Sequence, residues 1–277
     1  VKQAFDLIII YEGHSEPSPV WQTLVRGGHA HKIVITATPY RNDLFQFDVS
    51  PTASYIYTFA AAAAINIVKA PRFEVVEEVN ILAIVLAFLR QYPTSKCILK
   101  CKNFEKIEEY YRLFNTETEV LAVHDRYAND PRSNVKTGVP AKLSESVFRV
   151  LIHEHKLDEG VDVPEAKLLV LTYVLGSGRE LVQTVGRIVR VSGELEPVVL
   201  EFGHPRNFSM WTSYREFDSS LQTAGGVQKF LASLDTGKLI ELYLEAFPDF
   251  SYHENRFVGK FNLNTFDPDT ALSIPTA

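Results

Sequence analysis

The sequence predicts an α/β protein built on two parallel sheets, with a smaller accessory region at the C-terminal end. Short runs of apolar and β-branched residues, such as 5–10 and 166–174, are typical of strands buried on both faces of a sheet. Helical patterns, such as 103–115, alternate with these runs along the chain. Alternating strands and helices indicate a parallel sheet with helices on both of its faces.

The first sheet is expected within residues 1 to about 60. Its elements are strands at 5–10 and 32–39, with a short helix at 19–29 between them. The helix is closed by a pair of glycines, and the second strand stops at Pro39. The stretch 40–72 has little pattern, and its alanine run at 60–64 fits a helix or a linker.

The second sheet is expected to follow, and the remaining chain forms an accessory tail. Its elements are strands at 96–101, 119–124, 146–155, 166–174 and 196–203, helices at 77–91, 103–115 and 178–191, and a loop at 125–142. The tail is expected to hold helices near 210–218 and 226–246 and an aromatic, strand-like stretch at 251–263. The predicted domains are therefore 1–72, 73–205 and 206–277.

Composition bounds the function. A chain of 277 residues that is 46% hydrophobic can bury one large core or two ordinary ones. The net charge of −6 gives no global basic signature for nucleic acid, although a local groove can still be basic. The longest apolar runs, 59–68 and 81–89, are too short to cross a bilayer, which takes about 20 residues. We therefore expect no membrane partner.

The two cysteines, Cys97 and Cys101, form no disulfide framework, which favours a reducing, cytoplasmic compartment. Their spacing has no second pair nearby, so buried thiols are favoured over a zinc site. The sequence indicates no metal site. Because the chain leads into a strand almost at once, we expect it to be a fragment.

An acid, a glycine and a histidine, Glu12 to His14, follow the first predicted strand. In a nucleotide hydrolase an acid at such a strand end orients or deprotonates the attacking water, and a preceding acid binds Mg²⁺. Taken alone, the stretch is more often an ordinary turn. Thr36 and Thr38 end the next strand and are suited to relay hydrogen bonds between a nucleotide and a bound nucleic-acid strand.

Two later stretches carry further polar groups. Gly160 and Asp162 lie in a tight acidic turn, where the carboxylate is placed to accept from a ribose hydroxyl or to orient an arginine; a solvated loop is the alternative. Gln183, Arg187 and Arg190 lie three or four residues apart, so on a continuous helix they would share one face. Two arginines on one stripe suit a polyphosphate, and exposed helix charges are the alternative.

In this order the stretches E-G-H, T-A-T-P, D-E-G-V-D and Q-x-x-G-R-x-x-R resemble motifs II, III, V and VI of superfamily-two helicases of the DEAD/DEAH type. The run 96–103 falls where motif IV would lie. The resemblance covers roughly residues 5–205, and the stretch from Glu12 to Asp43 is most similar to bacterial and defence-associated members. It implies two RecA-like domains, the first incomplete, which clamp ATP between them and move along DNA or RNA.

The resemblance also implies roles for single residues. Glu12 matches the catalytic carboxylate, His14 the last position of the acid box, and Thr36 and Thr38 the coupling motif. Gly160 and Asp162 match motif V at the nucleotide, and Arg41 is placed to contact a nucleic-acid backbone. The motif VI positions, which sense and stabilise the transferring phosphate, fall on Gln183, Arg187 and Arg190.

Two departures from the family pattern matter. Tyr11 stands where the family has its Mg²⁺-binding aspartate, and a neutral phenol is a poor ligand for Mg²⁺. The phosphate-binding loop G-x-x-x-x-G-K-[ST] is missing from the sequence. We therefore expect the chain alone to be incomplete as an ATP hydrolase. Its completion requires an N-terminal segment or a partner chain; the alternative is a non-hydrolysing RecA-like scaffold that binds nucleic acid or a protein.

Other conspicuous residues receive plainer interpretations. His153 and His155 alternate at a strand end and are assigned no catalytic role. Trp211, Tyr214 and Phe217 have a helical spacing, which favours a place in the core over a base-stacking platform.

Overall fold

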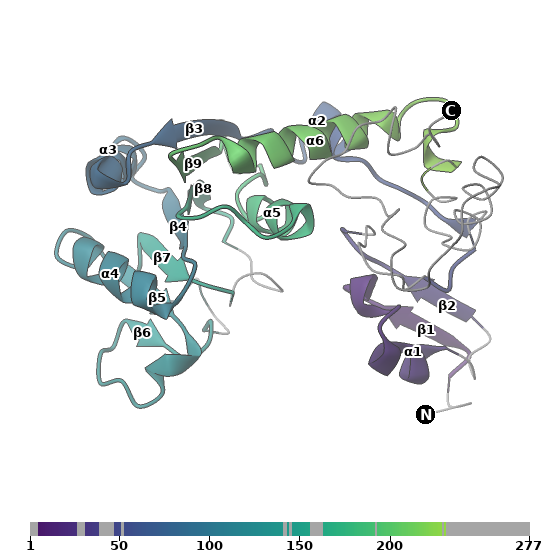
Figure 1. Cartoon of the computed structure of the whole chain (residues 1–277), viewed down its shortest axis with the longest axis horizontal. Coiled ribbons are helices and arrows are strands. Elements are labelled where there is room, and N and C mark those ends of the chain that lie inside the picture. The colour runs from purple at the N-terminus through teal and green to yellow at the C-terminus, as the bar shows by residue number, and fades with distance from the viewer. Residues whose placement is uncertain are drawn as a thin grey trace, which may run out of the picture. The chain divides into compact units, whose positions relative to one another are not determined.

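The structure is a computed structural model. It describes residues 5–26, 31–38, 47–50, 53–140, 143, 146–155, 163–191, 193–228 and 230. The chain divides into two compact units, the first made of residues 1–60 with 212–277 and the second of residues 61–211. Each unit is described by itself (Figure 1). The domain boundaries expected from the sequence stay a prediction.

The first unit contains a two-stranded parallel sheet. Strand β1 (Leu7–Ile10) pairs in register with β2 (His31–Val34), so that Ile9 lies beside Ile33. The 3-10 helix η1 (Gly13–Ser15) and helix α1 (Pro19–Val25) connect the strands. These elements confirm the predicted strand–helix–strand order, although each is shorter than expected. The face that carries Leu7, Ile9 and Ile33 is largely exposed.

Helix α6 (Arg206–Ser220) spans the boundary between the units, and its second half belongs to the first unit. There Asp218 accepts hydrogen bonds from the backbone N–H groups of Phe59 and Ala60, the first residues of helix α2 (Phe59–Ala64). This carboxylate satisfies donors that a helix start leaves unpaired. The alanine run is therefore helical. Trp211, Tyr214 and Phe217 are all buried, which confirms their expected place in the core.

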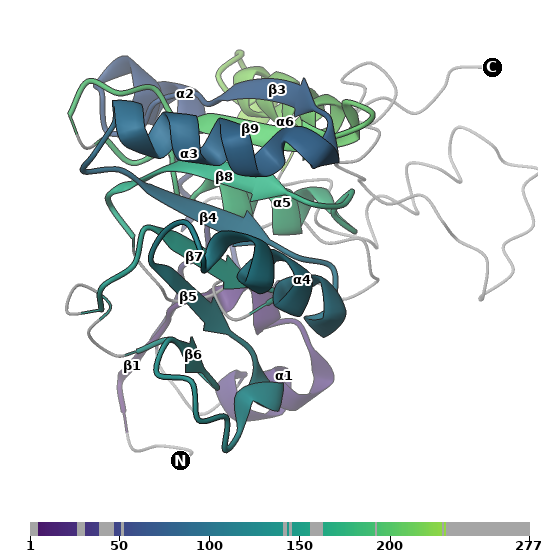
Figure 2. The ribbon, with the colours of Figure 1, turned by 90° about the vertical axis from the view of Figure 1, so that its left-hand side faces the viewer.

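The second unit is built on a seven-stranded, all-parallel sheet with the strand order β3-β9-β8-β4-β7-β5-β6. The strands are β3 (Arg72–Val76), β4 (Lys96–Lys100), β5 (Val120–Val123), β6 (Val135–Lys136), β7 (Val150–His153), β8 (Ala166–Leu171) and β9 (Val198–Phe202). The helices include η3 (Glu78–Asn80), α3 (Ile81–Gln91), α4 (Phe104–Phe114), η4 (Asp125–Tyr127) and α5 (Gly178–Val185). Figures 1 and 2 show α3 and α4 on one face of the sheet and α5 on the other.

Two of these strands were not predicted, and both lie at the edges of the sheet. Strand β3 pairs only with β9, and its exposed Arg72 and Glu74 form an ion pair with each other. It therefore lacks the continuous apolar run of a central strand. Strand β6 has only two residues, inside the stretch predicted as a loop. The expected elements at 226–246 and 251–263 lie almost entirely outside the described residues.

The two faces of this sheet differ in character. Alternate strand residues pack with α3 and α4 in an apolar core that includes Val85, Leu99, Tyr110, Phe114 and Ile152. Cys97 and Cys101 lie in this core, as expected, and burial raises the pKa of both thiols. The intervening residues point to the face that α5 covers. Four of them are buried and polar or charged, namely Lys100, His153, Lys167 and Glu201.

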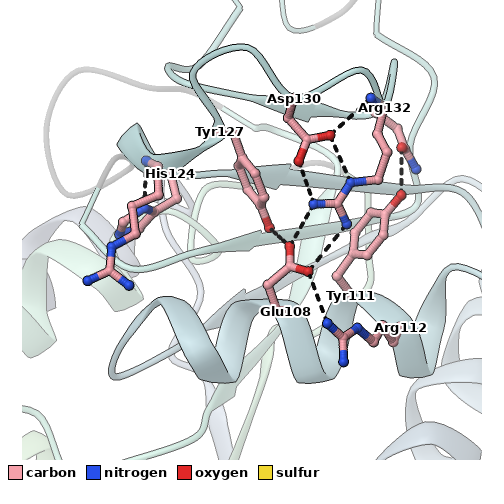
Figure 3. A network of polar contacts seen from close by, with 9 residues as sticks. Glu108, Tyr111, Arg112, His124, Tyr127, Asp130 and Arg132 are labelled. Carbon is pink, nitrogen blue, oxygen red and sulfur yellow. Dashed lines mark hydrogen bonds and ion pairs between the residues drawn. The ribbon is translucent and has the colours of Figure 1, made fainter.

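A polar network fixes the loop that follows β5 onto helix α4 (Figure 3). Arg132 donates to Asp130 at 2.7 Å and to Glu108 at 2.9 Å, and its guanidinium lies over the rings of Tyr111 and Tyr127. The hydrogen bonds from Arg132 lower the pKa of Asp130 to about 2. Glu108 also accepts from the Tyr127 hydroxyl at 2.8 Å. The predicted loop is thus ordered by one arginine.

A buried carboxylate and amide attach α6 to the sheet of the second unit. Glu201 on β9 accepts from the backbone N–H groups of Asn207 and Phe208, at 2.9 and 3.1 Å, and so caps the start of α6. Burial raises the pKa of Glu201 despite these bonds. The Asn207 side chain accepts from Leu175 N–H and donates to the carbonyl of Tyr173. The helix start is therefore fixed to two strand ends.

Replacing Asn207 should weaken this attachment. Asn207→Ala removes the acceptor of the buried Leu175 N–H, which costs about 1–3 kcal/mol for the unsatisfied group, and it also removes the bond to the Tyr173 carbonyl. We expect a lower midpoint in urea unfolding of the chain. Asn80→Ala, at an exposed asparagine whose side chain does not cap its helix, is the matched control and should change the midpoint little. Equal effects of the two substitutions would contradict this account.

Candidate nucleotide site

The acid turn at the end of β1 has an unusual backbone. Glu12 adopts the left-handed conformation, with φ 50° and ψ 44°, which is uncommon for a residue with a side chain. Its carboxylate Oε2 lies 3.5 Å from Nδ1 of the buried His14. Tyr11, in contrast, is 76% exposed. The turn thus brings together the acid and histidine that the sequence singled out, and leaves the phenol in solvent.

Gly13 is required by close packing against β2. Its N–H donates to the carbonyl of Ile35 at 2.8 Å. A Cβ atom at this position would lie 2.3 Å from a methyl carbon of Val34 and 3.3 Å from the Ile35 carbonyl oxygen. The glycine of E-G-H therefore serves to bring the turn against the neighbouring strand.

A buried carboxylate that the sequence did not single out holds this turn in place. Glu16 is fully buried and accepts from Arg26 at 2.9 and 3.0 Å and from Lys32 at 3.1 Å. Lys32 also pairs with Asp48. Burial raises the pKa of Glu16, but the hydrogen bonds from Arg26 and Lys32 outweigh that effect and leave the pKa below its usual value. No local spacing links these four charged residues, so no sequence pattern pointed to them.

The two threonines after β2 form a tight turn. Thr36 Oγ1 accepts from the N–H of Thr38 at 3.1 Å, and Thr38 is buried. A hydroxyl that bonds the backbone two residues later fixes the local chain direction. Arg41, the predicted backbone contact, lies outside the described residues, and so do Gly160 and Asp162.

We expected Gln183, Arg187 and Arg190 to share one face of a helix. This prediction is wrong, because helix α5 ends at Val185. Gly186 is the C-cap residue, and a Cβ there would lie 3.0 Å from the carbonyl oxygen of Val182. Gln183 is therefore helical, Arg187 lies in the following turn, and Arg190 forms an isolated antiparallel bridge with Val68. The motif's own glycine, Gly186, therefore ends the helix, whereas the prediction assumed that the helix continues to Arg190.

A buried ion pair ties α5 to the sheet. Lys100 Nζ, at the end of β4, lies 3.2 Å from Oε1 of Glu180, and the lysine side chain is fully buried. Glu180 also accepts from Gly176 N–H and from the Tyr173 hydroxyl. Burial raises the pKa of Glu180, but its contacts with Lys100 outweigh this and lower it overall. Ser177, which caps α5, and Glu180 have the S-x-x-E capping pattern, so the sequence did hold a signal for this carboxylate.

His153 lies beside this ion pair, because β7 pairs with β4 so that His153 is level with Lys100. It is 1% exposed, and neither ring nitrogen has a hydrogen-bond partner among the described residues. Burial lowers its pKa well below the usual value, and the positive charges of Lys100, His155 and Arg187 add to the effect. His153 is therefore a neutral imidazole near neutral pH. The sequence did not predict this burial.

The structure thus places the predicted residues in two groups. Glu12, His14, Thr36 and Thr38 belong to the first unit, at the carboxyl ends of β1 and β2. The second unit carries Gln183, Arg187 and Arg190, and the carbonyl of Arg190 accepts from Lys167 near the start of β8. Among the residues that the structure describes, no cluster of His, Cys, Asp or Glu is suited to hold a metal ion.

Comparison with known families decides the identity of the second unit. Residues 79–192 match the family model of the helicase conserved C-terminal domain. This segment is a helicase C-terminal domain. The resemblance to superfamily-two helicases is thereby confirmed for this domain, which contains Gln183, Arg187 and Arg190. A search of curated protein sequences finds no match.

Solved structures include similar chains. One is Saccharomyces cerevisiae Dbp5 bound to RNA and ADP BeF3, with a TM-score of 0.49 and 12% identity over 83% of this chain and 63% of that chain. Another is the ATP-dependent Type ISP restriction-modification enzyme LlaBIII bound to DNA, with a TM-score of 0.44 and 12% identity over 89% of this chain. The chain thus spans 63% of the Dbp5 chain and 21% of the LlaBIII chain.

Packing at Gly13 yields a test of the acid turn. Gly13→Ala forces a methyl group onto Val34 and should destabilise the first unit by about 1–3 kcal/mol, the usual cost of overpacking. Faster amide exchange at the β1 and β2 amides would report it. Gly138→Ala is the matched control, since a Cβ at Gly138 meets nothing within 4 Å. Unchanged exchange in Gly13→Ala would show that the turn has room to shift.

The helicase domain should lose stability in mild acid through His153. Its pKa in the folded chain lies below the unfolded value of 6.5, so the unfolded chain binds the proton first. The contribution to the free energy of unfolding is therefore lost as the pH falls below 6.5, by up to about 1.4 kcal/mol per pH unit for one proton.

Urea unfolding between pH 7.5 and 5 measures this effect. His153→Leu should flatten the pH dependence and stabilise the domain, because it removes an unpaired buried polar group. The exposed His204→Leu serves as control and should keep the dependence of the unsubstituted chain. If His153→Leu keeps the same slope, another group carries the effect.

Proposed function

We propose that the chain is part of an ATP-dependent nucleic-acid helicase or translocase, in which ATP binds between two RecA-like domains. The observation that carries the proposal is the helicase C-terminal domain at 79–192, with its glutamine and arginine pair intact. Two arginines directed at a polyphosphate have little use in a protein that binds none. In this function Arg187 and Arg190 stabilise the charge on the transferring phosphate, and Gln183 senses it.

The first unit would supply the remaining chemistry. Glu12 is held beside His14 at the end of β1, in the place of the water-activating carboxylate. The resemblance implies further residues of the proposed site. These are Gly160 and Asp162 for the nucleotide, and Thr36, Thr38 and Arg41 for coupling to nucleic acid. DNA and RNA are both compatible with it.

The residues present in this chain fit ATP but do not fit Mg²⁺. The exposed cation Arg190 and the half-buried Arg187 fit a polyphosphate, so ATP has binding residues in this chain. Mg²⁺ does not fit: Tyr11 offers an exposed phenol in place of a carboxylate, and the described residues hold no acidic cluster for the ion. No step of the proposed function in this chain therefore runs through Mg²⁺.

Among its described residues, the first unit leaves one face of its two-stranded sheet largely exposed. A parallel sheet is normally covered on both faces, whereas β1 and β2 expose Leu7, Ile9 and Ile33 on one face. Two strands alone are marginal in water. We propose that further strands and helices complete this RecA-like domain, supplied by an additional N-terminal segment or a partner chain that carries the phosphate-binding loop.

The second candidate function is a non-hydrolysing RecA-like scaffold that binds nucleic acid or a protein partner. The solvent-directed Tyr11 is the observation that favours it. A cytoplasmic location suits both functions. In the described part of the chain, no helix has the length and apolar character needed to span a membrane.

ATP turnover separates the two functions. We expect purified 1–277 to show no hydrolysis of Mg·ATP, with or without single-stranded nucleic acid, because catalysis needs positioned phosphates and metal. In a preparation whose first domain is complete, Arg190→Ala should lower the stimulated rate by about a thousandfold, the scale of an arginine finger.

The matched control is Arg90→Ala, at an exposed arginine in the last turn of α3. It should leave the rate unchanged. Equal rates for Arg190→Ala and Arg90→Ala would contradict the helicase proposal and support the scaffold. Hydrolysis by 1–277 alone that is lost in Arg190→Ala would instead show that this chain is complete. Tyr11→Asp in the completed protein tests the metal position: a raised rate identifies Tyr11 as the defect.

A further inference from the structure

Strand β8 contains a lysine where the rest of the strand is apolar. Lys167 is only 3% exposed, in the sequence A-K-L-L-V-L. Burying an ammonium group is costly unless it finds hydrogen-bond acceptors. Burial lowers the pKa of Lys167, and the positive charge of Lys69 lowers it further. A lysine kept here despite that cost needs a structural or functional reason.

The acceptors of Lys167 are two backbone carbonyls in the helicase motif, that of Ile188 and that of the second arginine, Arg190. Its Nζ donates to the carbonyl oxygen of Ile188 at 3.4 Å and to that of Arg190. Helix α5 has ended at Val185, so carbonyls beyond this point no longer find partners in a continuing helix. A cation placed after a helix C-terminus stabilises such carbonyls.

The same segment is fixed on its other side by the chain at 67–69. The N–H of Lys69 donates to the carbonyl of Val189 at 2.8 Å, and the N–H of Val191 donates to the carbonyl of Ile67 at 3.2 Å. The Lys69 ammonium binds further along, at the carbonyls of Gly193 and Glu194. In the segment 187–190, which bears the two arginines, the carbonyls of Ile188 and Arg190 therefore bind Lys167, and the carbonyl of Val189 between them binds the backbone of Lys69.

We propose that Lys167 is a positioning residue that holds the segment bearing Arg187 and Arg190, in place of the helical turn that Gly186 ends. The inference rests on the proposed function in that these arginines bind a polyphosphate. Lysine suits the role because one ammonium reaches two carbonyls, whereas an apolar side chain at this position would donate to neither. Lys167 touches no substrate itself and acts through the backbone of the arginines.

Amide hydrogen exchange in 1–277 tests the positioning. In Lys167→Met the reporter amides are Lys69 and Val191, whose hydrogen bonds cross to the arginine segment. We expect about tenfold faster exchange at both, on the scale of losing a hydrogen bond to a charged group. Amides of Leu99 and Ile152 in the opposite core should keep their rates and show that the domain is folded. Lys167→Arg, which keeps the cation, should restore most of the protection.

Lys69→Met is the matched control. Among the described residues this ammonium binds carbonyls beyond Arg190, so the substitution should leave the exchange of Val191 near that of the unsubstituted chain. If Lys167→Met loses protection in the whole domain, Lys167→Gln, which retains a donor, provides the comparison. Unchanged exchange at Val191 in a folded Lys167→Met or Lys167→Gln chain would overturn the proposal.

Phosphate binding is measured separately, with tripolyphosphate as the probe. The reagent phenylglyoxal modifies arginine side chains, and mass spectrometry follows Arg187 and Arg190. We expect tripolyphosphate to slow their modification in the unsubstituted chain and to protect them several-fold less in Lys167→Met. If tripolyphosphate protects neither arginine in the unsubstituted chain, the proposed function fails, and the exchange rates alone then decide whether Lys167 holds the segment.

Discussion

Charge buried on one face of a parallel sheet is the constraint on which the arrangement of the helicase domain depends. The face under α3 and α4 is apolar and can be filled by any well-packed set of side chains. The face under α5 carries Lys100, His153, Lys167 and Glu201, and charged groups among these need partners at fixed positions. Glu180 forms an ion pair with Lys100, and two backbone carbonyls accept hydrogen bonds from Lys167. Glu201 accepts from the backbone at the start of α6. Single buried side chains therefore place three successive segments on the sheet, namely α5, residues 187–190 and the start of α6. Apolar packing alone would not fix the position of each segment along the sheet.

The same constraint explains how an arginine pair can be held outside a helix. A helix would fix both arginines through its own hydrogen bonds, but Gly186 ends α5 before the first of them. The segment instead lies between the backbone of 67–69 and the ammonium of Lys167. Such an arrangement costs the desolvation of a lysine, yet it sets the direction of the chain at Arg190 independently of the helix axis.

The sequence predicted much of the fold, and its failures have physical causes. The strand–helix alternation gave the parallel sheets, because central strands such as β7 and β8 are continuous apolar runs. Edge strand β3 was missed since its exposed face is charged. At the site, the motifs located Glu12, His14 and the arginines, but the spacing rule assumed a helix that Gly186 interrupts. Glu16 and Lys167 were missed because their partners, such as Lys32 and Ile188, lie far away in sequence.

The acid turn shows why the departure at Tyr11 is more than the exchange of one side chain. Successive side chains of a strand point to opposite faces, and in β1 Leu7 and Ile9 are exposed while Ile10 is buried. Tyr11, in the turn that follows β1, is exposed as well. Glu12 then adopts a left-handed backbone, and after it Gly13 packs on β2 and His14 is buried. An acid at this exposed position would therefore face solvent. Because the described residues hold no group of ligands suited to a metal, a metal at this turn would need further ligands, which couples recovery of metal binding to completion of the first domain.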